Sequence, residues 1–450
     1  MQCSVTIVVE LAPEADVCQM ETAIQEAGRQ AMRAALTQAV RGYETAHAAC
    51  PHCSGEQAQS QSQSQGTVAR VVLTCFGRVV LSLRRQRCLR CGRRFRPADG
   101  CLAALAGGNV TPDLGAACAL AGASWAYATA SRVLRTLCGA QVSAEEVRRW
   151  TNRLGEGEAC TQQAAAERLL TPTADQVRAE RDAQARQQRL GSASAPPPAP
   201  APARLTVGLD GGWLPSREQP GGMEGKVGVV ATGTAAVGKR GRQRLTPRRY
   251  VATFASSAQV GALAYTAAVA LGGVEAEEQV VLGDGAAWIK TQADRHFPDA
   301  VGILDWAHVV RALQKTIRAA RPGRAHQATR RVLRQTLPNL LWHGDLAATL
   351  AVLRALRPAA PAEPIPLLEA TLRYLAGQRA WLGDYAAWQE QGYPVGSGLI
   401  ERAVAIVINW RMKGRGMRWC RTNASAVVAL RVRELNAGWA SDDDLLPLVA

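Results

Sequence analysis

The chain has 450 residues, 47% of them hydrophobic, which is enough for about two to four folded domains. Because no stretch approaches the roughly 18–20 apolar residues of a membrane span and residues 1–16 carry no secretory signal, we expect a soluble, cytoplasmic protein. The 53 Lys and Arg against 37 Asp and Glu give a formal charge of +16, which favours a polyanionic partner, although an ordinary basic enzyme would have the same total.

The first part of the chain holds a strand and helix region, 1–47, followed by a cysteine-rich module, 48–100. A C-x2-C loop places two thiolates at one edge of a tetrahedron, and two such loops are sized for a structural Zn²⁺. β-rich residues lie between the two loops, so the module is expected to be a zinc ribbon. Its function is either purely structural or, as the basic run 92–96 favours, contact with DNA. The predicted zinc ligands are Cys50, Cys53, Cys88 and Cys91.

Residues 110–190 are predicted to be helical and to bind DNA. Gly139 is typical of a helix end, and Ser143 with Glu146 has the spacing of a capping box that opens the next helix. Helix, short turn and helix resemble a helix-turn-helix, although any small helical domain could have this pattern. The exposed side of the second helix carries the predicted DNA contacts, Arg148 and Arg149.

A proline-rich spacer, 191–203, is the clearest predicted domain boundary. After it, three strand-like runs, a helix, a strand, a helix and a further strand predict an α/β domain with a mixed sheet over 204–307. Residues 308–392 are predicted to form helices only. Residues 393–440 contain a last helix and a basic tail.

Three carboxylates stand out in this second half. Asp210 and Asp284 each end a predicted strand, where aspartate is also a common turn residue. Glu401 lies in an apolar helix that we expect to be buried, so it needs a metal ion or, alternatively, an arginine partner. Such ligands, without Cys or His, suit Mg²⁺ or Mn²⁺, and two ions would serve phosphoryl transfer. Asp305 also ends a strand and is the second choice for the second aspartate.

The blocks VLGDGAAWIK, ILDWAH, YPVGSGLIE and RMKGRGMRWC resemble the signature blocks of bacterial insertion-sequence transposases, especially the ISKra group. That group is similar to the Mutator-like branch of DDE enzymes. The resemblance covers about residues 204–436. It implies a ribonuclease H-like core with an all-helical insertion before the last acidic residue. It also implies Asp210, Asp284 and Glu401 as the catalytic, metal-binding carboxylates.

The same resemblance implies supporting roles for Asp305 and His308 in a D-x-x-H motif. It further implies that the protein binds transposon ends in double-stranded DNA, cleaves and joins strands, and works as a homodimer or larger oligomer, associated with the nucleoid. Two rival hypotheses remain. One is a ribonuclease H-like nuclease that does not join strands, and the other is a catalytically inactive DNA-binding regulator descended from a transposase.

The basic tail is the last predicted DNA-binding segment. Gly414 and Gly416 would let the backbone approach DNA closely, and Trp410 would offer a stacking face. Phosphate contact fits this mixture of residues better than a solvated charge run, which is the usual alternative. The predicted contacts are Arg411, Lys413, Arg415, Arg418 and Trp419, the last also as a stacking face.

Overall fold

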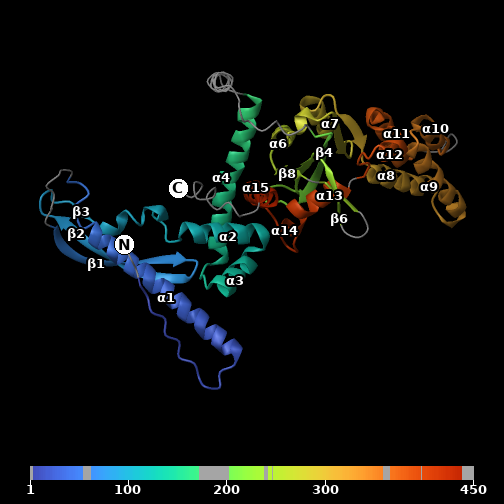
Figure 1. Ribbon diagram of the computed structural model, residues 1–450. Coiled ribbons are helices and arrows are strands. Elements are labelled where there is room, and N and C mark those ends of the chain that lie inside the picture. Colours follow the sequence, from blue (N-terminus) through green and yellow to red (C-terminus); the bar gives the residue numbers. More distant parts are fainter. Residues whose placement is uncertain are drawn as a thin grey trace, which may run out of the picture. The chain divides into compact units, whose positions relative to one another are not determined.

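The computed structural model describes residues 4–53, 62–171, 202–237, 242–245, 247–357, 365–396 and 398–437. The chain divides into two compact units (Figure 1). The N-terminal unit comprises Met1–Glu158 with Ala437–Ala450, and the C-terminal unit comprises Ala159–Asn436.

The N-terminal unit begins with one long helix and a three-stranded antiparallel sheet. Helix α1 (Val17–Ala46) starts at a capping box formed by Asp16 and Gln19. The strands are β1 (Ser62–Thr74), β2 (Gly77–Cys88) and β3 (Arg94–Phe95), in the order β1-β2-β3. Alternate residues of β2, from Val79 to Leu83, are buried against α1 and its neighbours. The strand expected before α1 is absent from residues 4–16, because no described strand pairs with them.

Helices α2 (Pro112–Ser124) and α3 (Tyr127–Cys138) and the first part of α4 (Ala144–Leu170) complete this unit. The predicted helix, turn and helix are confirmed as structure. Gly139 ends α3 with a φ of 72°, in the left-handed region that favours glycine, and Ser143 Oγ accepts a hydrogen bond of 3.0 Å from Glu146 N. The apolar side of α4, including Val147 and Trp150, is buried. A Cβ at Gly115 would lie 2.5 Å from the Trp150 ring, so glycine permits this close packing.

The C-terminal unit is built on a mixed sheet, as the sequence predicted (Figure 1). Its five strands have the order β10-β9-β4-β5-β8. Strands β4, β5 and β8 are antiparallel, whereas β9 and β10 run parallel to β4. The strands are β4 (Arg204–Leu214), β5 (Met223–Ala231), β8 (Arg248–Thr253), β9 (Glu278–Gly283) and β10 (Val301–Leu304). Strands β6 (Thr234–Val237) and β7 (Arg242–Leu245) form a separate two-stranded ribbon.

One face of the large sheet packs against helices. Leu205, Val207 and Leu209 of β4 share a buried cluster with residues of α6 (Ser257–Ala270), α7 (Ala287–His296) and α8 (Trp306–Ala320). The described residues after β10 then form helices up to Glu390. Helices α6 and α7 precede β9 and β10, respectively, and the helices after β10 are α8, α9 (Gln327–Trp342), α10 (Leu346–Ala355), α11 (Pro366–Gly377) and α12 (Tyr385–Glu390).

The opposite face of β4 is covered by the last helical segment. A Cβ at Gly208 would lie 3.4 Å from Ile400 Cβ, and one at Gly212 would lie 3.1 Å from Val404 Cγ1. Because glycine has no side chain, this segment can pack closely on β4 at both positions. Its parts are α13 (Gly398–Val404), a π-helical stretch (Ala405–Asn409), α14 (Trp410–Met412) and α15 (Arg421–Ala437).

The two units divide inside α4, whereas the sequence placed the boundary at the spacer 191–203, which lies outside the described residues. The end of α4 is held by the C-terminal unit. Gln162 Nε2 donates to Ala429 O at 3.2 Å, and Ala166 joins the core of the sheet. None of the helices in the described ranges combines the length and apolar character needed to cross a membrane.

Candidate metal centres and nucleic-acid interface

The four cysteines of the ribbon lie together, as their spacing predicted. The Cys50 and Cys91 sulfurs are 3.7 Å apart, as are those of Cys53 and Cys88, and all four lie within 4.8 Å of one another. Tetrahedral zinc with Zn–S bonds of about 2.3 Å requires sulfurs about 3.8 Å apart. The cluster therefore has the dimensions of a structural zinc site and could bind Zn²⁺.

The electrostatics of the cluster also favour a cation. Contact with the Cys91 sulfur, together with burial, raises the pKa of Cys53 to about 12, whereas the backbone N–H of Cys91 lowers the pKa of Cys88 to about 6. Only a cation lets all four sulfurs exist as thiolates at neutral pH. Cys50 and Cys88 are buried and pack against Phe95. Such a closed set of four ligands is typical of a structural rather than a catalytic site.

Three aspartates lie on or directly after adjacent parallel strands in the C-terminal unit. Asp284 and Asp305 follow β9 and β10, as predicted. The prediction that Asp210 ends its strand is wrong, because β4 continues to Leu214 and Asp210 pairs with Val227 of β5. Gly208 of β4 pairs with Leu282 of β9, so Asp210 and Asp284 both lie two residues beyond that pair. Gly283 of β9 pairs with Leu304 of β10, so Asp284 and Asp305 are likewise neighbours. The three carboxylates are consequently gathered at one edge of the sheet.

Each aspartate is oriented by a backbone N–H. Asp210 accepts from Gly211 N at 2.7 Å and Asp284 from Ala286 N at 2.8 Å. Asp305 caps α8, accepting from Ala307 N at 3.0 Å through Oδ1, while its Oδ2 contacts His308 Nδ1. Buried Asp305 thus uses both of its carboxylate oxygens in contacts within α8.

The environment of Asp210 disfavours its negative charge. Burial raises the pKa of Asp210 to about 6. The nearby negative charges of Asp284 and Asp305 also raise this pKa, whereas the hydrogen bond from Gly211 N lowers it. The hydrogen bond to Asp305 raises the pKa of His308. A cation between such carboxylates would relieve their repulsion.

The expectation that Glu401 is buried is wrong. Its side chain is 49% exposed, and Oε1 lies 3.4 Å from Nη2 of Arg311, which is itself 51% exposed. The reason is that α13 packs on the sheet through one side only, which buries Ile400 and Ala403 and leaves Glu401 on the outer side. The partner is thus an arginine, the alternative that the sequence had left open. Within the described ranges, the four cysteines are the only group of three or more possible metal ligands whose ligand atoms all lie within 4.8 Å of one another. The carboxylates do not form such a group.

Sequence reasoning missed Arg431, which supports the segment that follows Glu401. From α15, the buried Arg431 Nε donates to Ile406 O at 3.1 Å and to Val407 O at 2.9 Å. These carbonyls belong to the π-helical stretch, a distortion that is frequent at functional sites. Burial lowers the pKa of Arg431. No local sequence signal connects an arginine with carbonyl groups more than twenty residues earlier.

Residues that the sequence did not single out, from the helical region after β10, also support the acidic edge, which is the edge of the sheet with Asp210, Asp284 and Asp305. Tyr374 Oη donates to Asp284 O at 2.9 Å, and Gln378 Nε2 donates to Gly285 O at 2.7 Å. Tyr385 Oη donates to Leu304 O, directly before Asp305, at 2.8 Å. These bonds fix the backbone at two strand ends, which is what a preorganised site requires.

The basic tail is only partly accessible. Trp419 is 6% exposed and donates from Nε1 to Met412 O at 3.0 Å, so it is not available as a stacking face. Arg411 is buried with its guanidinium 5.1 Å from the Trp419 ring centre. Trp410 is exposed instead, with Arg402 4.5 Å from its ring centre. The exposed cations of the predicted set are Lys413, Arg415 and Arg418.

The predicted DNA contacts on α4 already have acidic partners. Arg148 binds Glu145 through two hydrogen bonds of 2.8 and 2.6 Å, and Arg149 Nε lies 3.3 Å from the same carboxylate. The hydrogen bond from Arg148 lowers the pKa of Glu145 to about 2. Much of the positive charge of this turn is therefore compensated within the helix.

A scan against protein-family models gave no match, and a search of curated proteins gave none either. The function must therefore be inferred from the residues themselves and from their geometry.

Proposed function

We propose that this protein is a DDE-type DNA transposase that binds transposon ends, cleaves them and transfers the strands to target DNA. One observation carries the proposal. The strand register brings Asp210 and Asp284 to one edge of the sheet, and α13, which bears Glu401, covers the face of β4 that contains Gly208 and Asp210. Three residues that are far apart in the sequence thus belong to one region of the C-terminal unit.

The proposed core is ribonuclease H-like. The antiparallel strands β4, β5 and β8, followed by the parallel strands β9 and β10 that are reached through helices, support this assignment. The helices between β10 and α13 correspond to the proposed insertion before the last acidic residue, and their bonds to Asp284 O and Gly285 O support the strand ends.

Asp210, Asp284 and Glu401 would hold the proposed metal ions. Their oxygen ligands suit Mg²⁺ or Mn²⁺, which when bound stabilise the attacking and leaving oxygens of phosphoryl transfer. Glu401 has to exchange Arg311 for a cation. This exchange costs little, because an exposed ion pair contributes only about 0–1 kcal/mol. Asp305 and His308 would position the neighbouring backbone of α8.

The DNA would contact the exposed cations of the basic tail, Lys413, Arg415 and Arg418. These cations follow α14 in the sequence, and α14 continues the helical segment that bears Glu401. Phosphates bound there would therefore be held by residues that follow Glu401 closely in the sequence. Action at two transposon ends requires at least a dimer in this proposal.

Cleavage of a labelled duplex that carries the element's own ends tests the proposal, with Mg²⁺ or Mn²⁺ present. The wild type should cut and form strand-transfer products, whereas Glu401→Gln should bind the duplex without cutting it. Glu369→Gln is the matched control, because Glu369 also pairs with an arginine on the surface of the C-terminal unit.

Each of the other possible results would favour a different function or a different site residue. Cleavage without joined products would favour a nuclease. Binding without cleavage by the wild type would favour the inactive regulator. Equal cleavage by Glu401→Gln would show that Glu401 is misassigned.

A further inference from the structure

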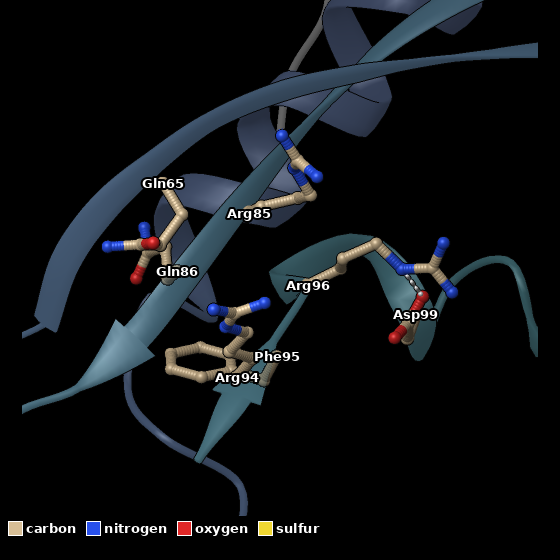
Figure 2. A pocket seen from close by; sticks show the side chains of 7 residues that line it. All are labelled: Gln65, Arg85, Gln86, Arg94, Phe95, Arg96 and Asp99. Carbon is tan, nitrogen blue, oxygen red and sulfur yellow. Dashed lines mark ion pairs between the residues drawn. The ribbon is translucent and has the colours of Figure 1, made fainter. Parts of the chain in front are cut away.

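The ribbon carries an open groove of about 520 Å³ that is rich in arginine (Figure 2). The groove is lined by Arg85 of β2, by Arg94 of β3 and by Arg96, which directly follows β3. All three side chains are exposed. Asp99, which also lines the groove, is bound to Arg96 at 2.9 Å. The groove is thus a cationic surface with one acidic residue at its side.

The pairing of β2 with β3 sets like charges against one another. Arg87 lies directly opposite Arg94 in the antiparallel register. Because side chains alternate along a strand, Arg85 shares a face with Arg87, and Arg96 shares it with Arg94. Like charges directly opposite each other destabilise a sheet. A bound anion would remove this repulsion.

Little within the ribbon compensates these charges. Residues 62–100 contain nine arginines and one acidic residue, Asp99. Among the described residues, Arg85 and Arg94 have no ion-pair partner, and Arg87 donates only to the carbonyl of Gly92, at 3.3 Å. A surface of this kind attracts phosphate groups, to which the planar guanidinium can donate two parallel hydrogen bonds.

The groove favours backbone phosphates over bases. Its aromatic residue, Phe95, is only 8% exposed and packs against Cys50 and Cys88, so it offers no face on which a base could stack. Arginines that contact backbone phosphates position a duplex and carry no sequence information. Single-stranded nucleic acid, which is usually held by exposed aromatic residues, fits this surface less well than a duplex.

We propose that Arg85, Arg87, Arg94 and Arg96 form a binding site for the phosphodiester backbone of duplex DNA that does not read its bases. The choice of DNA rests on the proposed function. The site depends on the cysteine cluster, because β3 is held by the hydrogen bond from Cys88 N to Arg93 O at 2.9 Å and by the packing of Phe95 on the cysteines.

The test is the affinity of the full chain for a labelled duplex of scrambled sequence, measured by fluorescence anisotropy over a range of salt concentrations without Mg²⁺ or Mn²⁺. The double variant Arg85→Gln, Arg94→Gln is compared with Arg354→Gln, Arg357→Gln, which removes the same charge from exposed positions in the C-terminal unit. Losing two phosphate contacts should reduce the slope of log K against log salt by about 1.8. The ribbon variant should show this reduction on both scrambled and element-end duplexes, and the control variant should not.

Equal slopes for the two double variants would overturn the proposal, as would a loss confined to element-end duplexes or to single strands. Zinc content and circular dichroism confirm that the variants fold, and Arg85→Lys, Arg94→Lys should keep the wild-type slope. Since no cleavage is measured, a failed cleavage assay leaves this test intact. Conversely, a transposase that cuts but holds DNA elsewhere would pass the cleavage assay and fail here.

Discussion

The four cysteines of the ribbon and the three proposed metal-binding carboxylates differ in how far their geometry is set before an ion binds. The cysteine sulfurs already lie at the separations of a zinc tetrahedron. The carboxylates share a region of the C-terminal unit but do not form a comparably tight group, and Glu401 faces Arg311. The cysteine cluster thus already has the geometry of a metal site, whereas the proposed carboxylate site would have to be completed by its ions.

This difference follows from the chain and from the chemistry. The cysteines come from two short loops joined by one hairpin, so local turns fix them. Asp210 lies in β4, Asp284 follows β9 and Glu401 lies in α13, so the packing of distant segments determines where the carboxylates lie. A site whose ligands are open to exchange suits catalysis, whereas a closed site suits folding.

Removal of the zinc ligands should have the largest effect. Cys50→Ser should reduce the zinc content of the chain from one ion to none and unfold the ribbon, because zinc binding contributes about 10–16 kcal/mol in zinc-finger peptides. Metal analysis and hydrogen exchange of residues 62–100 measure both effects. The control, Cys18→Ser, removes an exposed cysteine outside the cluster and should keep the zinc. Full zinc content in Cys50→Ser would contradict the assignment.

Loss of a carboxylate at the acidic edge should abolish chemistry without unfolding. Asp210→Asn should reduce DNA cleavage by at least about 10³-fold, since metal-ion stabilisation of several kcal/mol is lost. Zinc content should not change. Asp294→Asn, which alters an exposed aspartate of α7, is the control for cleavage. The proposal fails if the two variants cleave alike.

Arg431→Met should weaken the C-terminal unit, because the carbonyls of Ile406 and Val407 lose a buried donor. We expect the free energy of unfolding to fall by about 2–3 kcal/mol, measured by chemical denaturation. Arg354→Met, at an exposed position, should change it by less than about 0.5 kcal/mol. An equal shift in both variants would argue against a specific role for Arg431.

The smallest effect is expected at the ion pair of Glu401. Arg311→Gln should alter the free energy of unfolding by less than about 1 kcal/mol, because both side chains are half exposed. It should nevertheless raise the affinity for Mn²⁺ a few-fold, since a competing cation is gone. Arg357→Gln, which breaks another exposed pair, should leave Mn²⁺ affinity unchanged. Unchanged affinity in Arg311→Gln would remove the proposed competition.

Features that depend on near neighbours could be predicted from the sequence. The C-x2-C loops, the cap at Ser143 and the strands that precede Asp284 and Asp305 are all local patterns. Features set by packing between distant segments could not. The apolar run after Glu401 indicated burial all round, but α13 buries only one side.

The same limit applies to the basic tail and to the braces of the acidic edge. Trp419 has the composition of a DNA contact but is held by Pro215 O and Met412 O. Tyr374 reaches Asp284 O across ninety residues, and no spacing rule encodes such a contact.

The number of Mn²⁺ ions bound at the acidic edge tests the central claim most directly. Electron paramagnetic resonance titration of the zinc-loaded protein with an element-end duplex should show two tightly bound Mn²⁺ ions per chain in the wild type. Asp210→Asn, Asp284→Asn and Glu401→Gln should each bind fewer. The same Mn²⁺ stoichiometry in all four proteins would contradict the claim that these three carboxylates form one metal site.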